Sequence, residues 1–207
     1  MVEMTEKEMY KGRDWPEYNR ANEEFTDLVS FKALKYFITR DFERINRRIS
    51  FGKLIKSLLF EPGFKYIFWL RMTRYFYLHK KALFPFYVFS RLNLKHYSYK
   101  YNFDISYKTE ILPGFAISHH GYVLVSGSSV IGSNCLLRPG VVLGGKSLYE
   151  GGPQIIGDNV EFGVGSKCIG NIKVGNNVTV GANAVITHDV PDNCVVGGIP
   201  AKIIRNK

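Results

Sequence analysis

Residues 155–186 read IIGDNVEFGVGSKCIGNIKVGNNVTVGANAVI, and an apolar residue recurs at every sixth position of this stretch. With its upstream continuation, this column has nine members: Ile131, Leu137, Leu143, Ile156, Phe162, Cys168, Val174, Val180 and Ile186. Glycine follows six of the nine. A second column of small or apolar residues lies four positions after the first: Cys135, Val141, Val160, Ser166, Ile172, Val178, Ala184 and Val190. Columns that stay in register over about sixty residues indicate a structural repeat.

The repeat predicts a parallel β-helix. Six residues suffice for a short strand and a tight turn, with the apolar residue pointing inward and the glycine allowing close approach of the backbone. Three such units close one coil of about eighteen residues, and stacked coils bury a column that no single coil could bury. We therefore expect a mainly β domain of triangular cross-section over residues 101–207.

The period is interrupted once. Ile156 follows Leu143 by thirteen positions rather than twelve, and residues 145–153 between them do not fit the pattern. A coil tolerates such an insertion only as a loop that leaves the surface, and loops of this kind often form the wall of a ligand site.

The first hundred residues have a different composition. Residues 31–100 carry a net charge of +13 and 19 of the 30 aromatic residues, whereas residues 1–30 carry −4 and residues 101–207 only +1. Apolar residues at positions 34, 38, 42, 45 and 49 follow a helical spacing, and Phe64–Lys81 predicts a second helical stretch. We expect an α-helical region over residues 1–100 that precedes the β-helix.

The basic and aromatic segment has two interpretations. The aromatic run Phe84, Phe86, Tyr87 and Phe89 is surrounded by six cations: Arg71, Arg74, Lys80, Lys81, Arg91 and Lys95. Such a stripe belongs either to the core or to a contact between subunits. Alternatively, it lies against an anionic membrane surface, where aromatic rings suit the headgroup layer and cations meet the lipid phosphates.

Several classes of protein are disfavoured by composition. The chain is 45% hydrophobic, which argues against disorder. Its most apolar run, 82–89, is too short to span a membrane, and the first twenty residues do not resemble a secretory signal. Three cysteines without a C-x-x-C pair indicate reduced, buried thiols in a cytoplasmic protein. The five histidines lack the spacing of a zinc site, and no nucleic-acid-binding motif is present.

The repeat and several local motifs resemble a known family over about residues 62–207. The motifs are Pro62-Gly63-Phe64-Lys65, Asp104-Ile105, Ile117-Ser118-His119, Val142-Leu143-Gly144-Gly145, Ile169-Gly170-Asn171-Ile172 and Gly197-Gly198-Ile199-Pro200-Ala201-Lys202. Together they resemble the hexapeptide-repeat acyltransferases with a left-handed β-helix. Within these, they resemble the serine acetyltransferase branch, which also contains sugar and polysaccharide O-acetyltransferases.

The resemblance implies a catalytic pair. Enzymes of this branch use a histidine base that is oriented by an aspartate fifteen residues earlier, and His119 follows Asp104 by fifteen. Asp104 would accept the Nδ1 proton, leaving Nε2 to take a hydroxyl proton. His120 is the competitor. His119 is preferred because it lies six residues before Val125, in phase with the apolar column, and neighbouring strand residues face opposite ways.

The acceptor residues depart from the serine acetyltransferase pattern. Those enzymes carry an aspartate directly before the base and a histidine in the inserted loop, whereas this chain has Ser118 and Gly151-Gly152-Pro153 there. Loss of both groups argues against free serine, and a neutral, glycine-lined opening suits a polyhydroxylated acceptor. We expect Ser118, His120 and Gly152 to contact a sugar.

The donor implied by the resemblance is acetyl-coenzyme A, without a metal. Its pantetheine would lie in a groove between neighbouring subunits, along Gly144, Gly145, Gly163, Val164, Gly181 and Ala182. Lys202 would meet the nucleotide phosphates, with Arg205 and Lys207 equally well interpreted as a solvated basic end. The active unit would be a homotrimer, with a dimer of trimers left open.

These observations predict an acetyl-coenzyme A-dependent O-acetyltransferase that acts on a sugar hydroxyl of a capsular or other surface polysaccharide or its precursor. A serine O-acetyltransferase of cysteine biosynthesis is the first alternative. The second is a non-catalytic trimeric scaffold that docks on membranes. The predicted location is the cytoplasm, with peripheral membrane contact left open.

Overall fold

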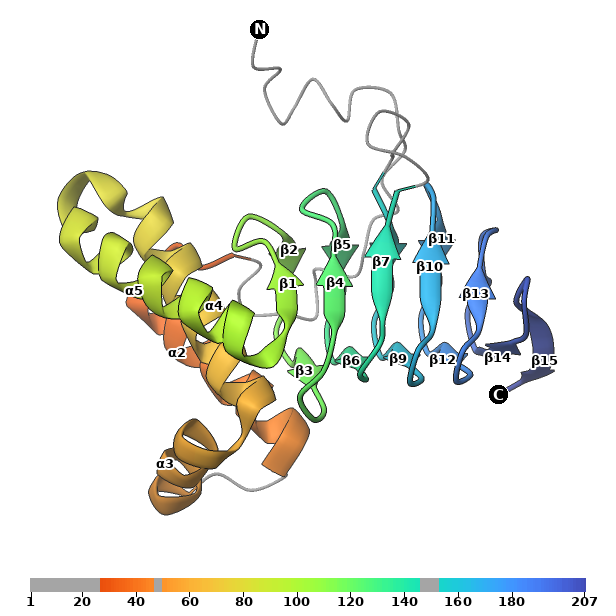
Figure 1. The fold of residues 1–207 in the computed structure, drawn as a ribbon, viewed down its shortest axis with the longest axis horizontal. Coiled ribbons are helices and arrows are strands. Elements are labelled where there is room, and N and C mark those ends of the chain that lie inside the picture. The colour runs from red at the N-terminus through yellow and green to blue at the C-terminus, as the bar shows by residue number, and fades with distance from the viewer. Residues whose placement is uncertain (1–26, 47–49, 146–152) are drawn as a thin grey trace, which may run out of the picture.

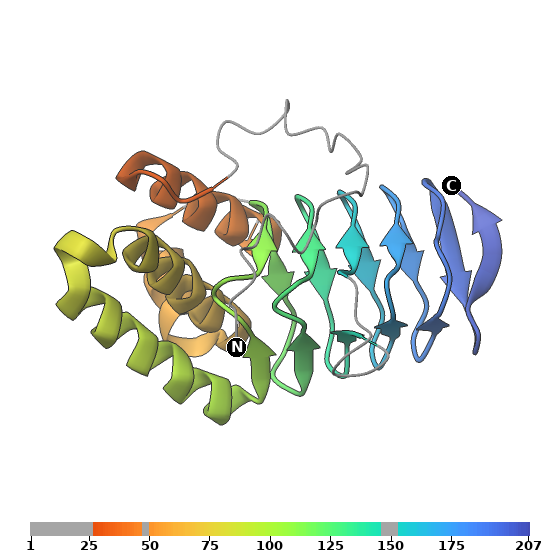
Figure 2. The ribbon, with the colours of Figure 1, turned by 90° about the horizontal axis from the view of Figure 1, so that it is seen from above.

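The computed structural model describes residues 27–46, 50–145 and 153–207. The described helices come first: α2 Phe31–Asn46, α3 Phe51–Phe60, α4 Pro62–Leu78 and α5 Lys80–Tyr101. They pack at one end of a stack of short strands, and the stack continues away from them to the C-terminus (Figures 1 and 2). The prediction of a helical region before a β-helix is confirmed.

The described strands form three sheets, which are the faces of the stack. One sheet has the order β1-β4-β7-β10-β13, the second β11-β8-β5-β2 and the third β15-β14-β12-β9-β6-β3. All pairings are parallel except that of β14 with β15. The strands are β1 Phe103–Ile105, β2 Glu110–Ile111, β3 Ala116–Ile117, β4 Val123–Val125, β5 Val130–Ile131, β6 Leu136–Leu137, β7 Val142–Gly144, β8 Ile155–Ile156, β9 Glu161–Phe162, β10 Lys167–Ile169, β11 Lys173–Val174, β12 Thr179–Val180, β13 Val185–Ile186, β14 Cys194–Gly197 and β15 Lys202–Asn206.

The two sequence columns form the core of the stack. Leu137 pairs with Phe162, and Ile131 pairs with Ile156, so that members of the first column lie over one another on successive coils. Every member of the first column is at most 1% exposed. Burial of such a side chain contributes about 1.5–3 kcal/mol. The column therefore supplies much of the free energy that holds the coils together.

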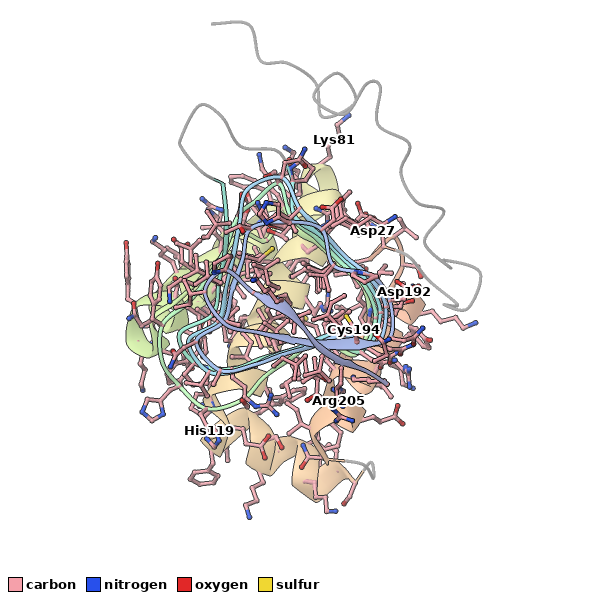
Figure 3. The ribbon with its side chains drawn as sticks, turned by 90° about the vertical axis from the view of Figure 1, so that its right-hand side faces the viewer. Asp27, Lys81, His119, Asp192, Cys194 and Arg205 are labelled. Carbon is pink, nitrogen blue, oxygen red and sulfur yellow. The ribbon has the colours of Figure 1, made fainter. Side chains whose placement is uncertain are left out.

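Close stacking of the coils explains two of the repeated glycines. A Cβ at Gly132 would lie 2.6 Å from the carbonyl carbon of Gly157 on the next coil. A Cβ at Gly163 would lie 2.7 Å from the amide nitrogen of Ala182. Contacts this short are not tolerated, so glycine at these positions allows one coil to lie directly on another (Figure 3).

Residues 146–152, which contain most of the predicted loop, lie outside the described residues. The register of the sheets continues across this segment, because Val142 pairs with Lys167 and Val130 pairs with Ile155.

A buried ion pair joins two helices to the first coil. Asp41 of α2 accepts hydrogen bonds from Arg71 of α4, at 2.8 Å from Nε, and from the backbone amides of Gly114 and Phe115, at 2.9 and 2.8 Å. Arg71 also donates to the carbonyl oxygen of Ile111, at 2.6 Å. Asp41 is fully buried and Arg71 is 4% exposed. Because the groups satisfy one another, this cluster fixes how the helices sit on the β-helix.

Two of the cations expected on the basic surface are therefore engaged within the chain. Arg71 is buried, and Arg74 donates to Asp27 at 3.0 Å and to the Lys108 carbonyl at 2.9 Å. The prediction that both surround an exposed aromatic run is wrong, because their partners lie on segments remote in sequence. The other four members of the set are exposed: Lys80, Lys81, Arg91 and Lys95.

Among the described helices, none is long and apolar enough to cross a membrane.

The three cysteines are free and buried, as predicted. Burial raises the pKa of Cys135 and of Cys168 to about 12 each. The pKa of an ordinary cysteine thiol is about 8.5, and only the thiolate form reacts readily.

We therefore expect Cys135 and Cys168 to react with a disulfide reagent at pH 8 at least about 1,000-fold more slowly in the folded protein than in denaturant. Because the folded state retains these protons, their contribution to stability is present below about pH 8.5 and is lost as the pH rises towards 12. Timed thiol titration with and without guanidinium measures the rates. Rapid reaction of either thiol in the folded protein would contradict the assignment.

Candidate active site

His119 lies at a widened corner of the β-helix, between β3 and β4. Val125 follows Ile117 by eight positions in this coil. In the later coils the equivalent residues are only six apart: Leu137 and Leu143, Phe162 and Cys168, and Val180 and Ile186. Two extra residues therefore project at this corner, and His119 and His120 are both exposed.

Because of the widened corner, the prediction that His119 is in register with the buried apolar column is wrong. The residue of this coil that occupies the buried column is Ile117, which pairs with Leu137. His119 lies in the turn that follows and has no place in the column. Alternation of side chains along a strand therefore does not distinguish His119 from His120.

The backbone of His119 is unusual. Its φ is +61°, in the left-handed region that non-glycine residues rarely adopt. The other non-glycine residues with positive φ among the described residues are all asparagines: Asn102, Asn134, Asn159, Asn177, Asn183 and Asn193. His119 is the exception in this set, and residues held in sparsely populated backbone conformations are concentrated at functional sites.

A groove of 420 Å³ opens beside His119, where the junction of α3 and α4 meets β3. Figure 3 shows His119 at the outside of the coil stack, on the side where α3 lies in Figure 1. Ser118, Glu61 and Arg44 also line the groove, and His120 does not. The volume is within the range of small-molecule sites, about 300–1,000 Å³. The groove favours His119 over His120 as the base.

The α4 helix is held against this groove by a close backbone contact. A Cβ at Gly63 would overlap the carbonyl oxygen of Ile117, the last residue of β3. Glycine therefore lets the first turn of α4 lie directly on β3, the strand that precedes Ser118. Glu61 precedes this turn as the N-cap residue, so it lies at the mouth of the groove.

Sequence reasoning missed Glu61 and Arg44. Glu61 lies between the two predicted helical stretches, and Arg44 is one of many cations in the first of them. Neither lies in the repeat, so no periodic signal points to them. Only the docking of the helices on β3 brings them to His119.

Asp104 lies on the coil next to that of His119. It is the exposed middle residue of β1 and pairs in register with Leu124 of β4. The turn after His119 rests on the end of α5, just before β1, since the amide of Gly121 donates to the Tyr101 carbonyl at 3.3 Å. Within the described part of the chain, no hydrogen bond joins Asp104 to His119. Asp104 lines a different groove, of 560 Å³, between β1 and α5.

The predicted donor-binding residues form two groups. Gly163-Val164 and Gly181-Ala182 occupy the same corner as His119 on later coils, and the amide of Asn183 donates to the Val164 carbonyl at 2.8 Å. Gly144 instead ends β7, the middle strand of the five-stranded sheet, at a different corner of the coil, and is followed by the exposed Gly145. One chain does not bring both groups into one groove. Lys202 begins β15 and is exposed.

Gly144 differs from the glycines that coil stacking requires. The nearest atoms to a Cβ placed there are side-chain carbons of Val142 and Leu124, at 3.7 and 4.0 Å. These are ordinary van der Waals distances, so packing within the chain does not demand glycine at this position.

Two further predictions concern the site. Gly152, predicted to contact the acceptor, lies outside the described residues. In the ranges that the structure describes, no group of three or more histidine, cysteine, aspartate or glutamate side chains is arranged to hold a metal ion.

Comparison with known proteins identifies the relatives of this chain. The serine acetyltransferase of Synechococcus elongatus is 33% identical over 152 residues, which are 72% of this chain and 60% of the relative. A structure of Neisseria gonorrhoeae serine acetyltransferase in complex with serine superposes with a TM-score of 0.70 at 26% identity, covering 86% of this chain and 72% of that one. The chain is a homologue of the serine acetyltransferases. It shares their hexapeptide-repeat left-handed β-helix, as the sequence resemblance implied.

A third relative is solved with coenzyme A. Serine acetyltransferase of Brucella abortus in complex with coenzyme A superposes with a TM-score of 0.68 at 26% identity, covering 91% of this chain and 71% of that one. The chain spans about 60% of the length of the Synechococcus relative. No family model matches the sequence.

The prediction of a saccharide acceptor is wrong, and with it the assignment to capsular or other polysaccharide synthesis. The relatives are serine acetyltransferases, and one of them is solved with serine. Ser118 in place of an aspartate, and Gly152 where the family has a loop histidine, suggested a neutral opening. The groove beside His119 is in fact charged, because α2 contributes Arg44 and the α3–α4 junction contributes Glu61.

Proposed function

We propose that the protein is a serine O-acetyltransferase that moves the acetyl group of acetyl-coenzyme A to the hydroxyl of serine. The observation that carries the proposal is His119. It lines a groove of small-molecule size in a chain whose relatives are serine acetyltransferases, one of them solved with serine.

In the proposed reaction, Nε2 of His119 takes the proton of the serine hydroxyl while the hydroxyl oxygen attacks the thioester carbonyl. The carbon–sulfur bond then breaks, and the coenzyme A thiolate receives the proton from the His119 imidazolium. The products are O-acetylserine and coenzyme A, with no covalent enzyme intermediate. A general base of this kind accelerates transfer by about 10²–10⁴-fold.

Asp104 is the proposed positioning residue for His119. It lies on the adjacent coil, and in free enzymes catalytic hydrogen bonds are often long and tighten only when substrate is bound. A hydrogen bond from Nδ1 of His119 to the Asp104 carboxylate would fix the tautomer and stabilise the imidazolium.

The donor-binding proposal is supported by Gly144 and by the exposed corner residues Val164 and Ala182. Glycine at position 144 is not required by packing within the chain, and it leaves room for a ligand to approach the backbone. Lys202 is proposed to meet the nucleotide phosphates. The two groups of donor residues lie at two different corners of the β-helix. We therefore propose a homotrimer in which each donor site lies between two chains.

The acceptor preference can be tested with the full chain by following coenzyme A release. Serine should accelerate release in a saturable manner. De-acetylated polysaccharides at matched hydroxyl concentration should leave it at the background rate of thioester hydrolysis. Acceleration by the polysaccharides without acceleration by serine would overturn the proposal.

We further propose that the exposed face of α5 makes a peripheral contact with an anionic membrane. Its apolar residues are 57–66% exposed: Phe84, Phe86, Phe89 and Leu92. Lys80 lies over the ring of Tyr77 on α4, and Arg91 lies over the ring of Tyr107 in the turn between β1 and β2. Lys81 points away from the molecule on the side opposite His119, so the contact would leave the groove open (Figure 3).

This contact predicts salt-sensitive binding to vesicles that contain anionic lipid. Each cation near such a surface contributes about 1 kcal/mol, so Lys80→Glu with Lys81→Glu should weaken binding by at least about tenfold. Lys167→Glu with Lys173→Glu makes the same charge change on the exposed β-helix and should have little effect. No co-sedimentation at low salt, together with a hexamer in solution, would assign the face to a contact between trimers instead.

A further inference from the structure

The groove beside His119 contains polar atoms that the chain leaves unpaired. Oε2 of Glu61, Nε of Arg44 and Oγ of Ser118 are each buried, and none has a hydrogen-bond partner among the described residues. An unsatisfied buried polar group costs about 1–3 kcal/mol. Six side-chain atoms of the described residues are buried without a partner, and half of them belong to residues that line this one groove. A bound molecule would complete their hydrogen bonds.

Glu61 has no structural role that accounts for its side chain. It is the N-cap residue of α4, but its carboxylate makes no capping hydrogen bond. Its backbone alone serves the helices, donating to the Ser57 carbonyl and accepting from the amide of Lys65, at 2.9 and 3.0 Å. A carboxylate at this position stabilises a helix through its dipole by only about 0.3–1 kcal/mol. The buried Oε2 therefore presents a negative charge to the groove.

Arg44 brings the opposite charge. Its NH2 group donates to Glu161 at 2.8 Å, and Arg138 contacts the other oxygen of the same carboxylate at 3.5 Å. Two guanidinium groups share one carboxylate, so this cluster retains a net positive charge. The Nε–H of Arg44 is the donor without a partner. The groove thus offers a cation, Arg44, and an anion, Glu61, together with Ser118 and His119.

We propose that Glu61 binds the ammonium group of the acceptor and that Arg44 binds its carboxylate, so that the groove selects a zwitterionic α-amino acid with a hydroxyl side chain. This inference rests on the proposed function and adds the residues that determine its acceptor. The ammonium group of a serine bound in this way pairs with Glu61, and its carboxylate pairs with Arg44. Its hydroxyl is then directed towards His119. Glu61 thereby supplies the negative charge that Ser118 does not.

The test compares Glu61→Gln with the wild type and with Glu43→Gln. Glu43 lies on α2, pairs with Arg40 at 3.5 Å and does not line the groove. Loss of a charge-assisted hydrogen bond should raise the KM for serine about 10- to 100-fold in Glu61→Gln. Its KM for acetyl-coenzyme A should not change, and Glu43→Gln should match the wild type. Calorimetric titration of serine should show the same loss of affinity without turnover.

A ligand that lacks the ammonium group separates this role from a structural one. The wild type should bind 3-hydroxypropionate weakly, and Glu61→Gln should bind it no more weakly than the wild type does. Equal loss of affinity for serine and 3-hydroxypropionate would assign Glu61 a structural role and overturn the inference. Glu61→Asp, which retains the charge, should recover part of the serine affinity. Thermal unfolding of each variant checks that the fold is intact.

The outcomes distinguish the inference from the proposed function. Serine turnover by the wild type with an unchanged serine KM in Glu61→Gln would overturn the roles of Glu61 and Arg44 and leave the proposed function standing. Absence of both serine turnover and serine binding in the wild type would overturn the proposed function itself.

Discussion

Replacing His119 by asparagine should lower kcat for acetyl transfer to serine by about 10²–10⁴-fold, because the substitution removes the general base. Asparagine is the preferred replacement since it tolerates the left-handed backbone that His119 adopts at φ +61°. The loss of activity then reports on the imidazole and not on backbone strain. Steady-state kinetics at saturating acetyl-coenzyme A measure it.

The matched control is His120→Asn. His120 is the exposed neighbour of His119 and does not line the groove, so kcat should stay within about threefold of wild type. Asp104→Asn should lower the same kinetic parameter as His119→Asn by a smaller factor, as expected of a positioning residue. Loss of activity in His120→Asn with retention in His119→Asn would reverse the assignment of the base.

Replacing Asp41 by asparagine should cost about 3–5 kcal/mol of unfolding free energy, because it leaves the Arg71 guanidinium buried without its counter-charge. The same change removes a charged acceptor from the backbone amides of Gly114 and Phe115. Since this cluster joins α2, α4 and the first coil, we expect the helical region to lose its attachment first. Urea unfolding followed by circular dichroism gives the free energy.

Asp27→Asn provides the comparison for the buried pair. Asp27 pairs with Arg74 at 3.0 Å, but its side chain is 39% exposed. Partly exposed pairs contribute about 0–1 kcal/mol, so this variant should unfold close to the wild type. Equal destabilisation by the two substitutions would contradict the structural role given to the Asp41–Arg71 pair.

The β-helix could be predicted because its physics is repetitive. Each coil repeats the same buried position and the same close backbone approach, so the signal accumulates from Ile131 to Ile186. The sequence argument fails where the repeat changes. Two extra residues at the corner after Ile117 take His119 out of the apolar column, and counting in sixes across that corner gives the wrong phase.

The acceptor side could not be predicted because it depends on tertiary packing. Gly63 allows α4 to rest on Ile117, and this contact brings Glu61 to the groove from a segment with no periodic signal. Tertiary packing also explains the wrong prediction for Arg71. Its sequence neighbours suggested an exposed cation, whereas its partner Asp41 lies thirty residues earlier on another helix.

The most direct test of the account is the rate at which the full-length protein converts serine and acetyl-coenzyme A to O-acetylserine, with the product identified by mass spectrometry. The account predicts saturable formation of O-acetylserine in equal molar amount to the coenzyme A released, and loss of that activity in His119→Asn. Coenzyme A release that does not depend on serine, or an acetylserine yield that His119→Asn leaves unchanged, would contradict it.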